Sequence, residues 1–205
     1  MSMTAPAVKF PHGISFEEFL ATVDEGTHAE WVDGEVVLMS PASERHESIS
    51  GFVYTALRGY LRRKQLGGRV LHAPFQMKLG PGLSGREPDV MFVAPEYMDR
   101  VRATHVAGPA DVAFEVVSPE SRMRDRREKF REYQQAGVRE YWLVDPMQKT
   151  AEVYRLSGGG VYELAAPGEP PRLASEVIPG LWIDPAGLWA QSPDEWVAYE
   201  EWGLI

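Results

Sequence analysis

Two short apolar runs, residues 89–93 and 112–117, constrain the fold of this chain more than any other feature. Runs of this length with almost no polar residue are typical of central strands that are covered on both faces. Such coverage needs helices on either side of a sheet, so the runs predict an α/β architecture. Each run contains one acidic residue, Asp89 or Glu115, and a buried carboxylate requires a partner because its desolvation is costly.

A β-hairpin is predicted near the N-terminus. Asp33-Gly34 separates strand-like residues 28–32 from residues 35–39, and both turn residues suit the positive φ of a tight hairpin turn. A short helix that opens with a capping box at Ser15 precedes this hairpin. Because side chains alternate along a strand, Glu30 lies on the opposite face of the hairpin from Trp31.

Helices and strands then follow one another along the chain. A helix between Ser43 and Gly67 carries apolar residues at the i, i+3, i+4, i+7 positions over four turns. A second helix, from about Arg124 to Ala136, ends at Gly137. The remaining predicted elements are strands at 70–79, 89–93, 112–117 and 140–144, followed by an outer hairpin of residues 151–156 and 161–165.

These elements predict one mixed α/β domain that spans residues 1–205, with its core at about 28–165. Residues from about 166 to 205 form an acidic tail that is rich in Trp and Pro. Prolines prevent a single helix there, so we expect the tail tryptophans to pack the tail onto the core, and a dimer arm is the alternative. These tryptophans are Trp182, Trp189, Trp196 and Trp202.

Charge is distributed unevenly along the chain, whose formal net charge is −9. Residues 1–47 carry −7 and residues 161–205 carry −7, whereas residues 48–86 carry +7 and contain no acid. A phosphate backbone responds to a local patch, so the negative total does not exclude a nucleic-acid partner. The same basic residues also fit solvated helix faces, so charge alone does not decide. They are Arg58, Arg62, Arg63, Lys64, Arg69, Lys78 and Arg86, with a second cluster at residues 122–131.

Several classes of protein are excluded by composition. Without cysteine the chain forms no disulfide, zinc–thiolate site or thiol nucleophile, and a cytoplasmic location fits best. No stretch reaches the roughly 18 apolar residues of a membrane span, so no membrane partner is expected. The first residues lack the basic and apolar regions of a secretory signal.

The two strand carboxylates suggest a metal site. Asp89 and Glu115 on neighbouring strands repel each other unless one holds a proton or a cation neutralises both. Hard cations such as Mg²⁺ bind carboxylate, water and phosphate oxygens. Two separate buried ion pairs, for instance with Arg122 or Arg139, are the alternative.

Hydrolysis at such a site calls for a lysine to orient water and to balance charge on the phosphoryl group. Val117 faces the same way as Glu115 and supplies no charge. The nearest candidate is Lys129 on the following helix, which shares a helix face with Asp125 and Tyr133. A solvated Lys129 paired with Asp125 is the alternative.

The ordered series of motifs resembles the bacterial family of putative restriction endonucleases, which belongs to the PD-(D/E)XK nuclease superfamily. The resemblance covers roughly residues 15–185, and it rests on the series because any one motif is weak. The motifs are Glu30-Trp31-Val32-Asp33-Gly34-Glu35, Met39-Ser40-Pro41 with His46, Pro88-Asp89-Val90, residues 114–121, Asp125 with Lys129, and residues 137–146.

This resemblance implies a restriction-endonuclease-like core, with a central mixed β-sheet flanked by helices. It implies hydrolysis of nucleic-acid phosphodiester bonds, with DNA as the expected substrate and Mg²⁺ as the cofactor, for which Mn²⁺ can substitute. A homodimer is expected, because cutting both strands needs two sites.

The resemblance also assigns roles. Asp89 matches the Asp of the motif and Glu115 its second acid, and both would bind the metal with the carbonyl of Val116. The helix lysine of the family matches Lys129. Glu30 and His46 match further characteristic positions. For His46, a proton shuttle and a hydrogen-bonded core histidine both stay open, and Glu30 could equally be a rim carboxylate bonded to Arg or backbone donors.

Two other functions compete with this one. The first is a catalytically inactive nuclease fold that binds nucleic acid or serves a regulatory role. The second is a hydrolase of another class, such as a small-molecule phosphoesterase. A serine elbow, a Walker loop and a zinc helix motif are missing from the sequence, which disfavours the second.

Overall fold

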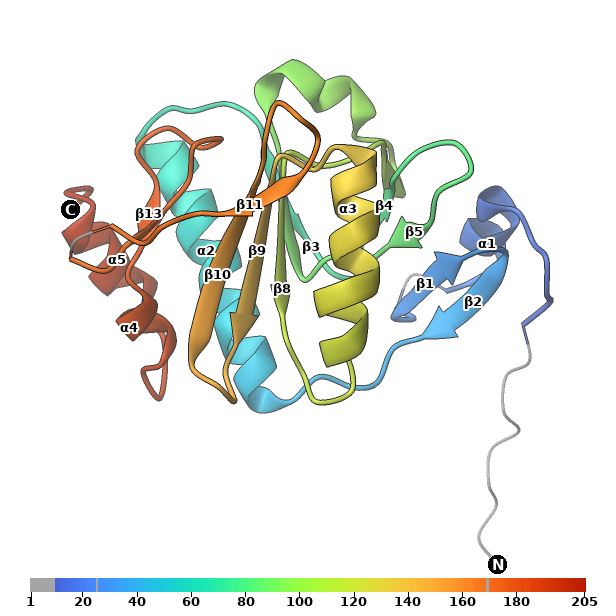
Figure 1. The fold of residues 1–205 in the computed structure, drawn as a ribbon, viewed down its shortest axis with the longest axis horizontal. Coiled ribbons are helices and arrows are strands. Elements are labelled where there is room, and N and C mark those ends of the chain that lie inside the picture. The colour runs from blue at the N-terminus through green and yellow to red at the C-terminus, as the bar shows by residue number, and fades with distance from the viewer. Residues whose placement is uncertain (1–9, 25, 169) are drawn as a thin grey trace, which may run out of the picture.

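The centre of this computed structural model is a six-stranded mixed sheet in the order β11-β10-β9-β8-β6-β3 (Figure 1). The structure describes residues 10–24, 26–168 and 170–205. β8 and β9 run parallel, and all other neighbours in this sheet are antiparallel. The strands are β3 (Arg69–His72), β6 (Val90–Val93), β8 (Val112–Val116), β9 (Glu140–Asp145), β10 (Thr150–Leu156) and β11 (Tyr162–Leu164).

Helices cover both faces of this sheet, as the two apolar runs predict. The long helix α2 (Glu44–Arg63) packs on one face, where it shares a core with Phe114 and Val116. The other face carries α3 (Phe130–Ala136), continuous with a π-helical turn, η2 (Arg124–Lys129) (Figure 1). Because side chains alternate along β8, Glu115 points to the α3 side of the sheet.

A second sheet of five strands has the order β2-β1-β5-β4-β7. The predicted hairpin is confirmed: in β1 and β2, Trp31 lies opposite Val36 and Glu30 lies opposite Val37. The predicted capping box at Ser15 opens helix α1 (Phe16–Thr22). The strands are β1 (Ala29–Val32), β2 (Glu35–Leu38), β4 (Gln76–Lys78), β5 (Gly85–Arg86) and β7 (His105–Ala107).

The prediction of one strand over 70–79 is wrong. The chain forms β3 and β4 there, which belong to different sheets. Between them lies Pro74, which has no N–H to donate to a strand ladder and so favours a break. Three further elements could not be predicted, because each is too short to give a recognisable sequence pattern. They are β5, β7 and the 3₁₀ helix η1 (Pro95–Arg100).

The C-terminal tail packs against α2, largely as expected. It contains β12 (Leu173–Ala174), β13 (Trp182–Ile183), α4 (Pro185–Leu188) and α5 (Glu195–Glu201). Trp202 is buried, with its ring 5.0 Å from that of Tyr60 on α2. For Trp196 the expectation is wrong, because this side chain is 57% exposed.

Within the described residues, no helix combines the length and apolar character needed to cross a bilayer.

Candidate active site

Lys129 lies at the centre of a buried group of carboxylates. Its Nζ atom is 2.9 Å from Glu115 Oε2, 3.1 Å from Glu30 Oε1 and 3.7 Å from Asp125 Oδ1. Glu30 comes from the five-stranded sheet and Glu115 from the six-stranded sheet, so one ammonium group joins the two sheets. The alternative of a solvated Lys129 is wrong, because the residue is only 3% exposed.

The π-helical turn η2 positions Asp125 and Lys129. Its wider backbone pattern leaves carbonyls available to other donors, and the Tyr141 hydroxyl donates to the carbonyl of Asp125 at 3.1 Å. Ser121 donates to Asp125 Oδ2, so this side chain is held from the start of the helix. Asp125 Oδ1 is buried and has no hydrogen-bond partner among the described residues. One carboxylate oxygen in the cluster therefore has unused acceptor capacity.

Glu115 is held by two donors of different kinds. The Tyr133 hydroxyl donates to Oε1 at 2.7 Å, while Lys129 contacts Oε2. Burial raises the pKa of Glu115 well above its usual range, Lys129 opposes this shift, and the carboxylates of Asp89 and Asp125 add to it. The site therefore favours a proton or further positive charge at Glu115.

Glu30 is fully buried and bound on both sides. Arg86 Nη1 donates to Glu30 Oε2 at 2.7 Å, and the backbone amide of Glu87 donates to Oε1 at 3.3 Å. Burial alone would raise the pKa of Glu30, but the charges of Lys129 and Arg86 lower it to about 2. Glu30 is therefore ionised. Its burial shows that it is not a rim carboxylate, but its donors are an arginine and a backbone amide, as that alternative expects.

Arg86 is itself buried, at 1% exposure, and forms a two-armed ion pair with Glu132 on α3. Its Nε and Nη2 atoms each lie 2.7 Å from a Glu132 oxygen. Burial lowers the pKa of Lys129, but Glu115 and Glu30 raise it more, so the net shift is upward. Both cations of the cluster are therefore charged.

Asp89 and His46 lie at the more open edge of the cluster. Asp89 Oδ2 accepts a hydrogen bond from the backbone amide of Val116 at 2.6 Å and lies 3.1 Å from His46 Nε2. Burial lowers the pKa of His46, but the hydrogen bond and charge of Asp89 raise it overall. The side chains of His46 and Asp89 are 17% and 16% exposed, whereas that of Lys129 is 4% exposed. A ligand would reach the cluster from this edge.

The donor chemistry of the cluster suits a hard cation. Carboxylate oxygens are the ligands that Mg²⁺ prefers, and Asp125 Oδ1 has free acceptor capacity. The hydrogen bond from Val116 to Asp89 brings Asp89 next to the strand that carries Glu115. In the described part of the chain, no three His, Asp or Glu side chains are already arranged around a metal-sized gap. The oxygen ligands present are therefore of the kind that binds a metal. In the structure, the Lys129 ammonium supplies the positive charge beside these carboxylates.

The two strand acids do lie in separate ion pairs, Glu115 with Lys129 and Asp89 with His46, but the partners suggested for them, Arg122 and Arg139, are wrong. Arg122 lies 3.0 Å from Asp145, and Arg139 lies 3.5 Å from Asp111, so neither contacts the two strand acids. The five residues singled out from the sequence instead form two contacting groups, linked through β8. One consists of Lys129 with Glu30 and Glu115, and the other of His46 with Asp89.

Arg86 is the residue that the sequence did not reveal. Its position in an acid-free run places it in the basic surface cluster, whereas the structure buries it against Glu30 and Glu132. Nothing in the sequence spacing distinguishes it from its exposed neighbours. Four residues of the second basic cluster are also paired with acids: Arg122, Arg124, Arg126 and Lys129.

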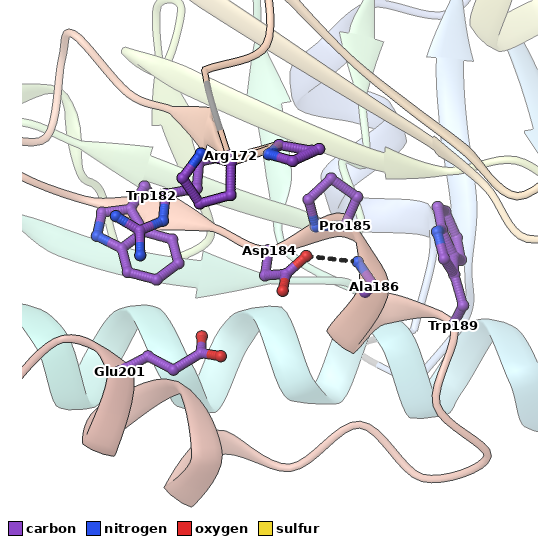
Figure 2. A pocket seen from close by; sticks show the side chains of 9 residues that line it. Arg172, Trp182, Asp184, Pro185, Ala186, Trp189 and Glu201 are labelled. Atoms are coloured by element: carbon purple, nitrogen blue, oxygen red, sulfur yellow. Dashed lines mark hydrogen bonds between the residues drawn. The ribbon is translucent and has the colours of Figure 1, made fainter.

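A separate hollow lies in the C-terminal tail and involves none of these residues. It has a volume of about 370 Å³ and is lined by Pro170, Arg172, Trp182, Pro185 and Trp189, among others (Figure 2). The Arg172 guanidinium covers the Trp182 ring at 3.7 Å, and Asp184 accepts a hydrogen bond from Ala186. The hollow is therefore a feature of tail packing, separate from the candidate site.

Comparisons with known proteins agree with this architecture. The family model Uma2, described as "Putative restriction endonuclease", matches residues 16–186. A crystal structure described as a putative nuclease belonging to DUF820, from Anabaena variabilis, is similar with a TM-score of 0.68. The likeness covers 86% of this chain and 98% of the other at 18% identity, so it supports the fold alone. No curated protein matches the chain.

Proposed function

Because this chain belongs to the Uma2 family of putative restriction endonucleases, we propose that it is a metal-dependent endonuclease that hydrolyses DNA phosphodiester bonds. One observation carries the proposal: Lys129 lies between Glu115 and Glu30, with Asp89 at the open edge of the same cluster. Two strand acids and one lysine are the groups that such hydrolysis needs, and here the lysine comes from a helix.

Asp89 and Glu115 would hold Mg²⁺, for which Mn²⁺ can substitute, together with the carbonyl of Val116. When bound, the metal would polarise a phosphate oxygen and lower the pKa of a water molecule. The upward pKa shift of Glu115 supports this assignment, because an added cation relieves the repulsion among the buried carboxylates.

The side chains have separate tasks in this proposal. The Lys129 ammonium orients the attacking water and stabilises the negative charge that develops on the phosphoryl group. Glu30 and Arg86 hold that ammonium in place and keep the local charge balanced. His46 Nε2, beside Asp89, holds a proton close to the opening of the site.

A binding protein without turnover is the alternative, and one observation favours it. Lys129 already pairs with both Glu30 and Glu115, so a cation of the chain itself offsets part of their negative charge without a metal. The two functions differ in one respect: the binding protein retains DNA with Ca²⁺ or Mg²⁺ and releases no cleaved product.

The proposed endonuclease also acts as a homodimer, which sedimentation of the full chain tests.

The decisive experiment titrates Mg²⁺ against wild-type protein and the Glu115→Gln variant, with supercoiled plasmid as substrate. Metal-dependent nicking that is lost in the variant supports the proposal. Glu140→Gln is a matched control, because Glu140 is a buried strand acid that binds Trp142 and Ser175 and not the cluster. Nicking that survives equally in both variants would contradict the proposed site.

A further inference from the structure

A groove between α2 and the edge strand β3 contains a row of cations that lack acidic partners. The groove has a volume of about 680 Å³, and its lining includes Tyr54, Arg58 and Arg62 from α2 and Arg69 from β3. β3 is the outermost strand of the six-stranded sheet, so the groove follows the edge of that sheet. All three arginines are exposed.

The three arginines of the groove form no ion pair with a carboxylate of the described residues. None of the ion pairs among the described residues involves Arg58, Arg62 or Arg69. By contrast, Arg122 and Arg126 of the second basic cluster pair with Asp145 and Glu152. Unpaired, exposed guanidinium groups along one groove fit an anionic ligand with several phosphates.

The groove is connected to the candidate active site by one ridge of α2. Residues four apart are neighbours on the surface of a helix, and five such positions begin at His46 and end at Arg62, turning around α2 by about 40° at each step. We call these residues the α2 ridge: His46, Ser50, Tyr54, Arg58 and Arg62. At 1.5 Å per residue the ridge extends about 24 Å along the axis of α2, which is long enough to contact several phosphates of one strand.

Two aromatic rings lie between the site and the arginines. The rings of Tyr54 and His72 are 4.3 Å apart, and the Arg58 guanidinium lies 5.1 Å from the Tyr54 ring. His72 pairs with Val90, directly after Asp89 in the chain, and the amide of Ala73 donates to the Asp89 carbonyl at 3.2 Å. The path from Asp89 to the arginines is therefore continuous through β3 and α2.

We propose that the α2 ridge and the β3 edge form the docking groove for the DNA strand that enters the active site. This inference rests on the proposed function and adds the surface that binds substrate on one side of the cleaved bond. Arg58, Arg62 and Arg69 contact successive phosphates, and the strand reaches the cluster at His46 and Asp89. The aromatic pair gives the bases a stacking surface close to the site.

The test measures binding of labelled single-stranded DNA in Ca²⁺, where binding is read without cleavage. Arg58→Ala/Arg62→Ala should weaken binding of an oligonucleotide of about 12 nucleotides by about tenfold and reduce the slope of log affinity against log salt by about 1.5. Arg127→Ala/Arg131→Ala is the matched control, because both residues are exposed on the α3 side and the charge change is the same. The control should bind within about twofold of wild type.

Two further results separate this inference from the proposed function. If the two double variants weaken binding equally, or if neither does, the groove is not the docking site, although metal-dependent cleavage by wild type would still stand. If wild type binds DNA through the groove but never cleaves it with Mg²⁺, the docking surface stands and the endonuclease proposal fails. Oligonucleotides of about two nucleotides should bind weakly, since they cannot span the ridge.

Discussion

Lys129 Nζ lies 2.9 Å from Glu115 Oε2, so a helix residue supplies the charge that the strand cannot provide at Val117. Val117 is buried in the core on the same side of the sheet as Glu115. Glu30, from the second sheet, contacts the same ammonium at 3.1 Å. The cluster therefore couples the packing of the two sheets to the charge balance of the candidate site.

Replacing Lys129 should destabilise the protein as well as inactivate it. Lys129→Met leaves Glu30 and Glu115 buried without their shared cation, so we expect the free energy of unfolding to fall by about 3 kcal/mol. Urea denaturation measures this change. Adding Glu115→Gln to the variant should restore part of the loss, since one uncompensated carboxylate is removed. An unchanged midpoint for Lys129→Met would contradict the ion-pair account.

Glu30 should make stability depend on pH. Its pKa in the folded protein is about 2, below the ordinary value of 4.5, so ionised Glu30 stabilises the fold above pH 4.5. This contribution decreases as the pH falls from 4.5 towards 2, and about 1 kcal/mol of it should be lost by about pH 4. The Glu30→Gln variant lacks the contribution of an ionised carboxylate at this position, so its unfolding free energy should fall less between about pH 7 and pH 4. Equal losses in both proteins would show that Glu30 is not held as an anion.

Tyr133 should act as a positioning residue for Glu115. Tyr133→Phe removes the hydroxyl that donates to Glu115 Oε1, so we expect kcat to fall by about tenfold with little change in KM. The loss of one buried hydrogen bond should cost about 1 kcal/mol of stability. Tyr162→Phe is the control, because it loses a comparable bond to the Val138 carbonyl outside the cluster. A similar loss of kcat in both variants would point to a general packing effect.

Two glycines of α2 should respond oppositely to alanine. A Cβ atom at Gly59 would lie 1.9 Å from the Tyr199 hydroxyl, so Gly59→Ala should push α5 away from α2 and destabilise the protein. Gly51 has open space, and Gly51→Ala should stabilise the same helix by about 0.5–1 kcal/mol. Thermal unfolding compares the two variants directly. If Gly59→Ala were also stabilising, the close packing of α5 on α2 would be wrong.

The central sheet could be predicted because its strands carry strong local signals. Burial on both faces leaves a continuous apolar run, and the hairpin at Asp33-Gly34 has a turn with a specific backbone requirement. This hairpin forms β1 and β2 of the second sheet. The rest of that sheet could not be predicted, since β5 and β7 contain two and three residues and are defined by their long-range partners. The break at Pro74 divides an apolar segment whose alternation alone favours a single strand.

The candidate site likewise contains residues that could be predicted from the sequence and one that could not. Asp89 and Glu115 could be identified because each is an acid inside an apolar strand, and a buried charge requires a partner. Helix spacing places Lys129 on one face with Asp125 and Tyr133, and all three lie in the cluster. Arg86 could not be found in this way, because its burial results from contact between β5, β1 and α3, which are far apart in sequence.

Asp89 is proposed to bind the metal at which DNA is cleaved. The most direct test is the single-turnover rate of DNA cleavage with Mg²⁺ for wild-type protein and Asp89→Asn, after both are shown to have similar unfolding midpoints. The account predicts that wild type cleaves and that the variant is slower by at least about 100-fold, with DNA binding in Ca²⁺ retained. Cleavage by Asp89→Asn at the wild-type rate would contradict it.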